Sequence, residues 1–489
     1  MSATARRGAL QYRPVGASPI KFGTSGWRGV IADDFTFANV RLAVTAIAGH
    51  AKSRKPHPTL LVAHDTRFYS EEFTRLAVEV LLEHGIRVLC ADSFAPTPAV
   101  AFEILRRKVD GAINFTASHN PAEYHGLKFS GADAGQAMPE VTSDIEARVA
   151  RLAAAHGARG RRRGAADSNG AAETISLAEP YLERLEQLVR FDVIRKSGAK
   201  FTADPRHGCG IGYLDRALSD HGIPVQAMHT DRDVLFDGKG PDVSEEILAP
   251  LSKTVRESGA TAGLATDGDA DRFGIVDRDG TWIAPNYILA LLYDYLCETR
   301  GWNMAAARSV ATSHMLDAAA SARGQKTYQT PVGFKYIGQL IREDKIALGG
   351  EESAGLSVRG HIPEKDGILA CLLVAEMTAA RGVSIGEQIR QVFRKLGREF
   401  RPVRQNLQLT EEEKARALEK MRSGESTLLG RKIAGIDRTD GAKFVFEDGS
   451  WMLCRMSGTE PLLRLYTEAG SVEASGRLAR EAAAWIRKE

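Results

Sequence analysis

The sequence lacks the features that mark membrane-bound, secreted and disulfide-rich proteins. No apolar run approaches the roughly 18 residues that a membrane-spanning helix needs. The N-terminal stretch, Met-Ser-Ala-Thr-Ala-Arg-Arg, leads into no apolar core of the signal-peptide kind. Only five cysteines occur among 489 residues, and none forms a Cys-x-x-Cys pair. This scatter fits reduced thiols and argues against a disulfide framework or a zinc site. We therefore expect a cytoplasmic protein without a membrane partner.

An excess of charge of one sign is also absent. The chain carries 65 basic and 62 acidic residues, a net charge of +3, so nothing indicates a nucleic-acid partner. The basic cluster at 159–163 has no aromatic residues between its arginines, and we interpret it as part of a solvated, mobile linker over 153–173. A Gly-x-x-x-x-Gly-Lys-[Ser/Thr] segment is missing as well, which argues against a nucleotide-dependent kinase.

The length of the chain and its alternating patterns indicate several α/β domains. At about 150 residues per domain, a chain of 489 residues should form three or four. Short apolar runs alternate with helical patterns, which is typical of βαβ units. A loose repeat supports this division, because His84-Gly-Ile-Arg-Val-Leu resembles His221-Gly-Ile-Pro-Val-Gln, and Arg323-Gly-Gln-Lys-Thr-Tyr is a weaker third copy.

The pattern changes near residues 398–404. A charged helix is expected at 410–422, followed by strand-like segments at 443–446, 451–454 and 462–466, which indicate a small α+β domain with antiparallel pairing. We therefore predict an α/β protein with three similar α/β domains, built on mixed sheets, and a smaller C-terminal α+β domain. The predicted boundaries are 1–160, 161–280, 281–397 and 398–489.

The loop Asp267-Gly-Asp-Ala-Asp-Arg272 carries three carboxylates at alternate positions, directly after the small apolar run 261–266. Three like charges this close repel each other, and a hard divalent cation with oxygen ligands would neutralise them. The alternative is a solvated acidic turn. An EF-hand is excluded, because Arg272 and Arg278 stand where that loop needs Gly and Glu. A cation directly after the acids suits an anionic substrate such as a phosphate.

A hydroxyl group lies in the polar loop Thr116-Ala-Ser-His-Asn-Pro121. Ser118 is adjacent to His119, and Lys128 follows closely. A serine near a histidine and a lysine is typical of a nucleophile or a phosphate carrier. The alternative is an Asn-Pro turn with a capping serine.

Three further segments have polar or glycine-rich patterns. Gly350-Glu-Glu-Ser-Ala-Gly355 pairs carboxylates with a hydroxyl, which suits either sugar hydroxyls or a solvated loop. The donors that a phosphate dianion needs are combined in Arg455-Met-Ser-Gly-Thr459 with Arg464, and again in Gly23-Thr-Ser-Gly-Trp-Arg-Gly29. A solvated hairpin turn is the alternative for 455–459. Gly208-Cys-Gly-Ile-Gly212 is a weak dinucleotide signal, because Tyr213 stands where the motif needs its third glycine.

Four of these loops, taken together and in this order, resemble the α-D-phosphohexomutase superfamily: Thr-Ala-Ser-His-Asn-Pro, Asp-Gly-Asp-Ala-Asp-Arg, Gly-Glu-Glu-Ser-Ala-Gly and Arg-Met-Ser-Gly-Thr. Their sequences are most similar to those of its phosphoglucomutase/phosphomannomutase family. The resemblance runs from about Phe22 to the C-terminal region. It implies three similar α/β domains and a smaller fourth domain around a central active-site cleft, which agrees with the division above.

The resemblance also implies roles for the residues of these loops. Ser118 would be the phosphoserine, and its phosphate would share one Mg²⁺ with Asp267, Asp269 and Asp271. The other catalytic groups would be Arg28 and Arg272, which neutralise the phosphoserine, an active-site lysine, Lys365, and the acid/base candidates His119 and Lys128, which the sequence does not rank. The substrate-binding groups would be Thr24, Ser25, Gly333, Lys335, Glu351, Ser353, Arg455, Ser457, Gly458, Thr459 and Arg464.

The reaction implied by the resemblance interconverts glucose 1-phosphate and glucose 6-phosphate. The phosphoserine gives its phosphoryl group to the free hydroxyl of a hexose monophosphate, glucose 1,6-bisphosphate forms as intermediate and activator, and the other phosphate returns to the serine. The partner is a hexose phosphate, and the protein is expected to be a monomer or homodimer. A phosphomannomutase, a bifunctional enzyme, a phosphoglucosamine mutase and a non-catalytic phosphosugar-binding protein are the alternatives. Glucosamine-active members carry Gly-Glu-Gln-Ser followed by a His, whereas here Glu352 stands in that loop and Ala354 and Gly355 follow it.

Overall fold

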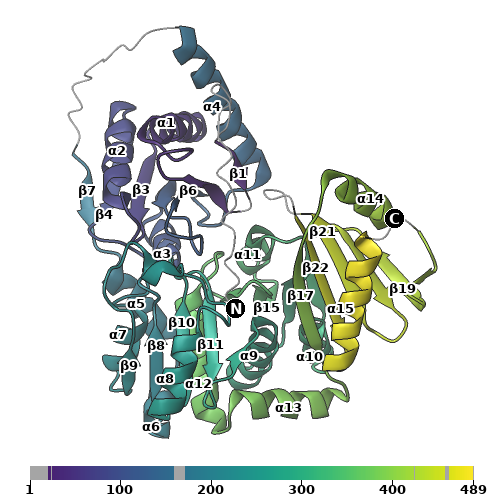
Figure 1. Ribbon diagram of the computed structural model, residues 1–489. Helices are drawn as coiled ribbons and strands as arrows, with labels where there is room; N and C mark the ends of the chain where they lie inside the picture. Colours follow the sequence, from purple (N-terminus) through teal and green to yellow (C-terminus); the bar gives the residue numbers. More distant parts are fainter. Residues whose placement is uncertain (1–19, 24, 159–170, 423, 457–461, 488–489) are drawn as a thin grey trace, which may run out of the picture.

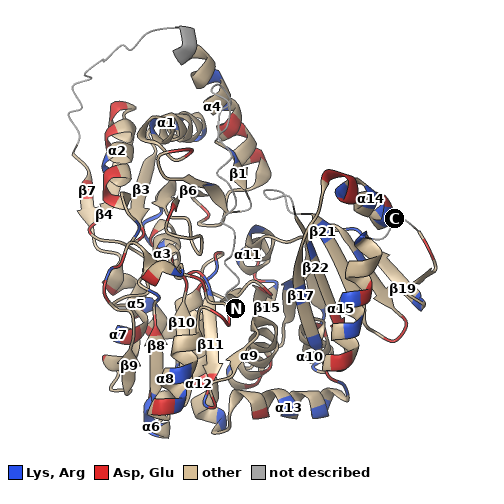
Figure 2. Ribbon diagram, viewed as in Figure 1, with Lys and Arg blue, Asp and Glu red and all other residues tan. Residues whose placement is uncertain are grey.

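The computed structural model describes residues 20–23, 25–158, 171–422, 424–456 and 462–487 (Figure 1). These residues form four consecutive parts, each with its own sheet. Charged side chains of both signs are interspersed over the outer helices in the view of Figure 2, as the balanced composition predicts.

The first part is a seven-stranded mixed sheet of order β1-β2-β6-β5-β3-β4-β7. Strands β3, β4, β5 and β7 are parallel, whereas β6, β2 and β1 pair antiparallel. Strand β3 is a nearly continuous buried apolar run, as expected for a parallel strand covered on both faces. The elements are β1 Phe22–Gly23, β2 Gly26–Val30, α1 Phe37–Arg54, β3 Thr59–His64, α2 Ser70–Glu83, β4 Arg87–Ala91, α3 Thr97–Arg107, β5 Gly111–Phe115, β6 Tyr124–Gly131, α4 Pro139–Ala158 and β7 Glu173–Ile175.

The segment predicted as a linker, 153–173, is only partly irregular. Its first six residues complete the helix α4, and Glu173 begins β7, which returns to the first sheet beside β4. The prediction was wrong at these two ends, because small residues such as Ala153–Ala155 favour a helix as readily as a loop. Residues 159–170 lie outside the described part of the chain.

The second part has a five-stranded sheet of order β12-β11-β10-β8-β9, and the third has a four-stranded sheet of order β14-β13-β15-β16. The second comprises α5 Ala178–Leu188, α6 Phe191–Ser197, β8 Phe201–Asp204, α7 Leu214–Ser219, β9 Val225–Ala227, η1 Phe236–Gly238, α8 Ala249–Ser258, β10 Ala262–Thr266, β11 Phe273–Asp277 and β12 Trp282–Ile283. The third comprises α9 Pro285–Arg300, β13 Ala305–Ser309, α10 Met315–Ser321, β14 Thr327–Thr330, α11 Phe334–Arg342, β15 Ile346–Glu351, β16 Gly355–Val358, α12 Gly367–Arg381 and α13 Ile385–Leu396.

The fourth part is a six-stranded antiparallel sheet of order β17-β22-β21-β20-β19-β18, covered by two helices. Its elements are β17 Arg401–Gln408, α14 Glu411–Arg422, β18 Thr427–Leu428, β19 Arg431–Asp437, β20 Ala442–Phe446, β21 Trp451–Met456, β22 Leu462–Ala469 and α15 Val472–Arg487. The predicted helix at 410–422 and the three predicted strands are confirmed. The fold class is confirmed as well: three α/β parts and a C-terminal part with antiparallel pairing. The domain boundaries themselves stay predictions.

One hydrophobic cluster runs through the first three parts and includes almost the whole of α12. A smaller cluster joins Val310 and Ala311 of the third part to Trp451, Leu453 and Tyr466 of the fourth.

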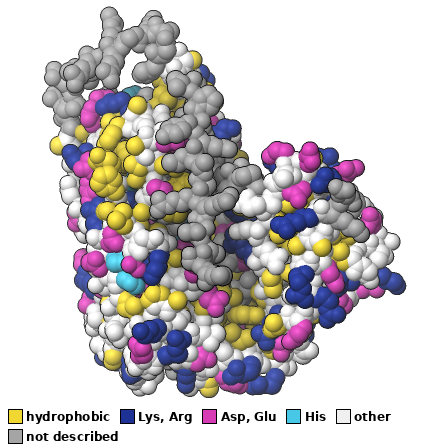
Figure 3. Space-filling view, viewed as in Figure 1, with side chains coloured by type: hydrophobic (Ala, Val, Ile, Leu, Met, Phe, Trp, Pro, Cys, Tyr) yellow, Lys and Arg dark blue, Asp and Glu magenta, His cyan; other side chains and the backbone are white. Residues whose placement is uncertain are grey.

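Within the described residues, no single helix is long and apolar enough to cross a membrane; α12 and α13 pass such a test only as a pair, and they are bent by 75°. Hydrophobic side chains also gather on the face of the first part drawn in Figure 3.

The same hairpin recurs in the first three parts, and each copy carries a polar loop. The loop 116–123 joins β5 to β6, the loop 267–272 joins β10 to β11, and the loop 352–354 joins β15 to β16. In every copy the first strand pairs parallel with one neighbour (β3, β8 or β13) and antiparallel with the second strand of the hairpin. The three loops therefore lie at the carboxyl ends of parallel strands, where α/β sheets bind ligands.

Candidate active site

Ser118 and the acidic loop are in direct contact, although 149 positions separate Ser118 from Asp267 in the sequence. The Ser118 hydroxyl is buried and donates a hydrogen bond of 2.8 Å to Asp267 Oδ2. Its backbone has a φ of +53°, in the left-handed region that non-glycine residues seldom adopt. The backbone N–H of Ser118 donates to Thr116 Oγ1 at 2.9 Å. The loop thus presents the serine oxygen to the carboxylates in a conformation that the surroundings must hold.

The three aspartates of the acidic loop fit a metal site. All three are fully buried, and one carboxylate oxygen from each lies within 4.8 Å of the others. Oδ1 of Asp269 and Oδ1 of Asp271 have no hydrogen-bond partner, and buried carboxylate oxygens are costly to leave unsatisfied. Burial, together with the charges of Asp269 and Asp271, raises the pKa of Asp267 to about 8. A hard divalent cation would bind the unpartnered carboxylate oxygens and would neutralise the negative charge of the three aspartates.

Two lysines face the aspartates. Lys128 Nζ donates to Asp269 Oδ2 at 2.5 Å and to Asp271 Oδ2 at 2.9 Å, and Lys365 Nζ donates to Asp271 as well. Burial alone would lower the pKa of Lys128, but the charges of Asp269 and Asp271 outweigh it and raise that pKa. The two lysines in turn hold the pKa of Asp271 well below its usual range despite burial. Lys128 is therefore an ammonium ion in this arrangement.

Two arginines and a histidine complete the cluster. Arg28 Nη1 donates to Asn120 Oδ1 at 2.6 Å, and the Arg272 backbone N–H donates to Asp267 Oδ1 at 3.0 Å. Burial and the charge of Arg272 lower the pKa of Arg28 to about 10. His119 Nδ1 lies 3.5 Å from Ser118 Oγ. Burial and the charges of Arg272 and Arg28 hold the pKa of His119 well below its usual range, so the imidazole is neutral.

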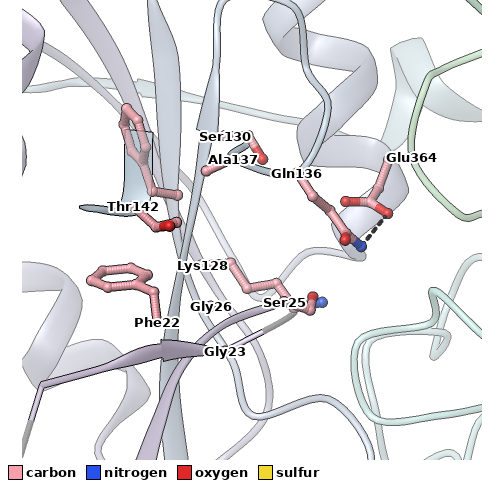
Figure 4. Close-up of a pocket in the computed structure, with 11 residues that line it drawn as sticks. Phe22, Gly23, Ser25, Gly26, Lys128, Ser130, Gln136, Ala137, Thr142 and Glu364 are labelled. Carbon is pink, nitrogen blue, oxygen red and sulfur yellow. Dashed lines mark hydrogen bonds between the residues drawn. The ribbon is translucent and has the colours of Figure 1, made fainter. Parts of the chain in front are cut away.

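A small cavity adjoins Lys128 (Figure 4). Ser25, Gln136 and Glu364 line it, and Gln136 Nε2 donates to Glu364 Oε1 at 2.9 Å. Ser25 Oγ and Gln136 Oε1 are buried without a hydrogen-bond partner. Gln136 and Glu364 were not among the predicted site residues. For Glu364 the only sequence signal is its position beside Lys365.

The loop predicted to bind sugar lies against the acidic loop. The Phe273 N–H donates to Ala354 O at 3.1 Å, and Gly367, which follows Lys365 and Asp366, donates to Ala270 O at 3.0 Å. Glu351 Oε1 accepts a bond of 2.8 Å from the N–H of Gly333. Gly333 has a φ of +127°, which explains the glycine at this position. The structure therefore joins the segment 330–335 to the sugar loop.

Glu351 itself has an unusual environment. It is buried, and burial together with the charge of Glu352 raises the pKa of Glu351 to about 7. Glu352, by contrast, is turned to Ser309 and Thr312, whose hydroxyls donate to its Oε2 at 2.9 and 3.2 Å. Ser353 and Lys335 are half-buried. Burial lowers the pKa of Lys335, partly offset by Glu140.

Glu351→Gln should stabilise the protein while it lowers activity. The pKa of this carboxyl rises from 4.5 to about 7 on folding, so the folded state favours its protonated form. The contribution of that form to the free energy of unfolding is fully present below pH 4.5 and is lost as the pH rises through 7. Glutamine cannot ionise, so at pH 8 the variant should unfold at a higher temperature than the wild type. The gain in the free energy of unfolding should be at most about 3 kcal/mol. At pH 4 the two proteins should match, which serves as the internal control. The loss of the charged acceptor should lower kcat/KM for a hexose phosphate by roughly 10- to 100-fold. Equal Tm values at pH 8 would contradict this prediction.

The predicted phosphate loop is described in part. Arg455 in β21 and Arg464 in β22 are direct Cα partners in an antiparallel pair, so their side chains share one face of the sheet. Arg455 Nε donates to Asp440 Oδ2 at 2.8 Å, and the same oxygen accepts the N–H of Val332 in the segment before α11. Four predicted substrate residues lie outside the described residues, namely Thr24, Ser457, Gly458 and Thr459.

The glycine run 208–212 has a local packing role. A Cβ atom on Gly208 would lie 2.6 Å from Gly268 O, and the N–H of Cys209 donates to that same oxygen at 2.9 Å. A Cβ on Gly210 would lie 2.4 Å from Thr266 Oγ1. The glycines therefore let this segment approach the acidic loop closely, which accounts for the weak dinucleotide signal without a nucleotide.

Two more contacts hold the acidic loop, and sequence reasoning missed both residues. Thr97 begins α3 in the first part, its N–H donates to Asp269 O at 2.9 Å, and its hydroxyl donates to an oxygen of the Asp269 carboxylate. Asn114 Nδ2 donates in turn to Thr97 Oγ1 at 3.0 Å. Nothing local in the sequence marks Thr97, because its partner is 172 positions away.

Three α/β domains and an antiparallel C-terminal domain, with a buried serine held against a triad of aspartates, define an α-D-phosphohexomutase. Comparison with known proteins agrees over all four domains. Models of the "Phosphoglucomutase/phosphomannomutase, alpha/beta/alpha" domains I, II and III match residues 19–156, 179–280 and 284–396, and the model of the C-terminal domain matches 405–484. The chain belongs to the phosphoglucomutase/phosphomannomutase family. It is a phosphohexomutase, an isomerase that acts as an intramolecular phosphotransferase.

Individual relatives differ in the sugar for which they are named. A phosphoglucomutase/phosphomannomutase of Thermococcus kodakarensis is 29% identical over 92% of this chain and 95% of its own length. A phosphoglucosamine mutase of Latilactobacillus sakei is 32% identical over 96% and 98%. A solved structure from Thermus thermophilus, described as a phosphomannomutase, is 32% identical, with a TM-score of 0.81 over 96% of this chain and 99% of that one. At this identity the sugar is not resolved.

A more distant structure shares the fold and was solved with ligands. It is the N-acetylphosphoglucosamine mutase of Aspergillus fumigatus in complex with GlcNAc-6P and magnesium, 15% identical, with a TM-score of 0.56 over 96% of each chain.

Proposed function

We propose that this enzyme interconverts glucose 1-phosphate and glucose 6-phosphate through a phosphorylated Ser118 and a glucose 1,6-bisphosphate intermediate. The hydrogen bond from Ser118 Oγ to Asp267 carries the proposal, because it brings the hydroxyl to the buried carboxylate triad, beside the guanidinium and ammonium groups of the cluster. Phosphoryl transfer needs positioning and charge stabilisation more than covalent chemistry. A buried hydroxyl next to a metal site and several fixed cations supplies both.

The residues of the triad, Asp267, Asp269 and Asp271, would hold one Mg²⁺, with the phosphate on Ser118 as a further ligand. Magnesium would offset negative charge on the oxygens of the transferring phosphoryl group. Its ligands fit the preference of Mg²⁺ for a few carboxylates plus phosphate oxygens. The magnesium in the distant fungal structure supports this choice of metal.

The charged and polar side chains around Ser118 would perform the transfer. Arg28 and Arg272 would neutralise the phosphate on Ser118. The neutral imidazole of His119 can accept a proton from the attacking sugar hydroxyl, and the ammonium of Lys128 can donate one, so these two are the candidates for acid/base catalysis. Lys365 would add a second cation beside Asp271.

The substrate would lie between the sugar loop and the C-terminal domain. Glu351 and Ser353 would bind sugar hydroxyls, with Ser25, Gly333 and Lys335 nearby as further substrate contacts. Arg455 and Arg464 share a face of the C-terminal sheet, and they would bind the phosphate that is not being transferred, together with the residues of 457–459. One such phosphate site must serve both orientations of the bisphosphate.

A sugar assay tests the substrate. With Mg²⁺ and a catalytic amount of the matching 1,6-bisphosphate, kcat/KM for glucose 1-phosphate should exceed that for mannose 1-phosphate and glucosamine 1-phosphate by at least about tenfold. The motif Gly350-Glu-Glu-Ser353, in place of the Gly-Glu-Gln-Ser of glucosamine-active members, supports this preference. The relatives named for mannose and glucosamine make those two sugars the alternatives to measure. A higher kcat/KM for mannose or glucosamine would overturn the assignment to glucose and leave the mutase activity intact.

A further inference from the structure

Arg67 lies behind the serine loop and is fully buried. It follows β3 in the segment Asp65-Thr-Arg67, and every one of its five side-chain N–H groups has an acceptor. Nε donates to Asp65 Oδ2 at 3.1 Å. The two Nη atoms donate to four backbone carbonyl oxygens, which are those of Ser118 at 2.6 Å, Asn120 at 2.6 Å, Pro121 at 2.8 Å and Tyr124 at 3.0 Å.

Three of these carbonyls belong to the loop that presents Ser118, and the fourth, that of Tyr124, lies at the start of β6 directly after it. We propose that Arg67 is a positioning residue for phosphoryl transfer: it fixes the backbone of 118–124 so that Ser118 Oγ faces the aspartate triad. The inference rests on the proposed function of Ser118. Arg67 has no donor left for a substrate phosphate, so it acts through the loop and not on the substrate.

The conformation of Ser118 explains why such a residue is needed. Its φ of +53° persists only where surrounding contacts over-determine the backbone. The Ser118 carbonyl is held from one side by Arg67, and from the other side Gly268 approaches it, since a Cβ on Gly268 would lie 2.6 Å from that oxygen. Fixing the carbonyl fixes the peptide plane, and with it the direction in which Oγ points.

Arginine is suited to this role and lysine is not. The guanidinium is a planar fork with five donors, whereas an ammonium is a point charge with three. Arg67 is itself anchored: its backbone N–H donates to Asp65 Oδ1 at 3.0 Å, and its guanidinium lies 5.0 Å from the centre of the Phe236 ring in the second part. A lysine would keep the charge opposite Asp65 but lose most of the hydrogen bonds to the four backbone carbonyls.

The second part of the chain contains a matched control. Asp204-Pro-Arg206 follows β8 as Asp65-Thr-Arg67 follows β3, and the Arg206 N–H donates to Asp204 Oδ1 at 2.9 Å. Arg206 is also fully buried. Its guanidinium, however, contacts His229 and the carbonyl of Gly240 and not the serine loop. Arg67→Lys and Arg206→Lys therefore make the same change at the corresponding position after a strand, once at an arginine that contacts the serine loop and once at an arginine that contacts Gly240.

The test compares both variants of the full chain with the wild type. For Arg67→Lys we expect kcat to fall roughly 100-fold with KM within about threefold of the wild type, because a displaced nucleophile slows transfer without removing a substrate contact. Amide hydrogen exchange over 116–124 should be at least about tenfold faster. For Arg206→Lys we expect a lower Tm, but kcat within about threefold of the wild type and unchanged exchange over 116–124.

Unchanged exchange over 116–124 in Arg67→Lys, or equal falls in kcat for both variants, would overturn the inference. If Arg67→Lys does not fold, Asp65→Asn replaces it, because an amide opposite Arg67 Nε loosens the same anchor and should change both readouts in the same direction. If the wild type has no mutase activity, the proposed function fails, and the exchange measurement still decides whether Arg67 holds the loop.

Discussion

Ser118→Ala should abolish mutase activity while the protein stays folded. Without the hydroxyl, no phosphoserine forms, and a reaction that passes through a covalent phosphoenzyme loses its carrier. We expect kcat for the conversion of glucose 1-phosphate to glucose 6-phosphate to fall by at least about 10⁴-fold, the scale seen when a nucleophile is removed. The assay contains Mg²⁺ and a catalytic amount of glucose 1,6-bisphosphate.

Stability separates this loss from unfolding. Alanine removes the donor to Asp267 and the 3.5 Å contact of Oγ with His119 Nδ1, and the remaining contacts of Ser118 are made through its backbone. The Tm should stay within a few degrees of the wild type, about what the loss of one hydrogen bond costs. The matched control is Thr116→Ser, which keeps the hydroxyl that accepts the Ser118 N–H. Substantial turnover by Ser118→Ala would contradict the phosphoserine mechanism.

Asp267→Asn should remove both the mutase activity and the response of the protein to magnesium. Burial and the neighbouring aspartates already favour the protonated form of Asp267, whose pKa is raised to about 8 without a metal. Asparagine imitates that neutral form, so the metal-free variant should be at least as stable as the wild type at neutral pH. It cannot supply the third charge, and we expect kcat to fall by at least about 10³-fold.

Thermal unfolding with and without Mg²⁺ checks the metal. A ligand at 100 times its Kd stabilises the folded protein by about 2.7 kcal/mol, so the Tm of the wild type should rise by several degrees with saturating Mg²⁺, and that of Asp267→Asn should not. Asp192→Asn is a suitable control, since Asp192 is exposed and forms an ion pair with Lys196 on the surface of α6. An equal rise in Tm for wild type and Asp267→Asn would refute the site.

Much of the fold follows from local sequence patterns. The strand after Thr261 and its acidic loop could be predicted, because a run of small apolar residues is typical of a buried strand and the Asp-Gly-Asp-Ala-Asp that follows is too polar to continue it. The change to antiparallel pairing after residue 398 was likewise visible in alternating strands at 443–446 and 451–454. The ends of the predicted linker were not, because Ala-rich segments carry no turn signal.

The site was predictable only where its chemistry lies within one loop. Ser118 and the three aspartates stand out because their grouping is local: the serine stands beside a histidine, and the three carboxylates occupy alternate positions of one loop. Arg67 and Thr97 do not, since their contacts join segments that are far apart in sequence. The same limit applies to Glu351, whose raised pKa comes from burial that no local pattern reveals. Residues that hold this site thus need the structure, whereas the residues proposed to face the substrate stand out in the sequence.

The most direct measurement of the central claim is the intact mass of the protein after incubation with glucose 1,6-bisphosphate and Mg²⁺. The wild type should gain one phosphoryl group, located at Ser118 by peptide mapping, and should lose it when excess glucose 1-phosphate is added, with bisphosphate as the product. Ser118→Ala should gain none. A wild-type enzyme that turns over without phosphorylation, or that carries the phosphate on another residue, would contradict the account.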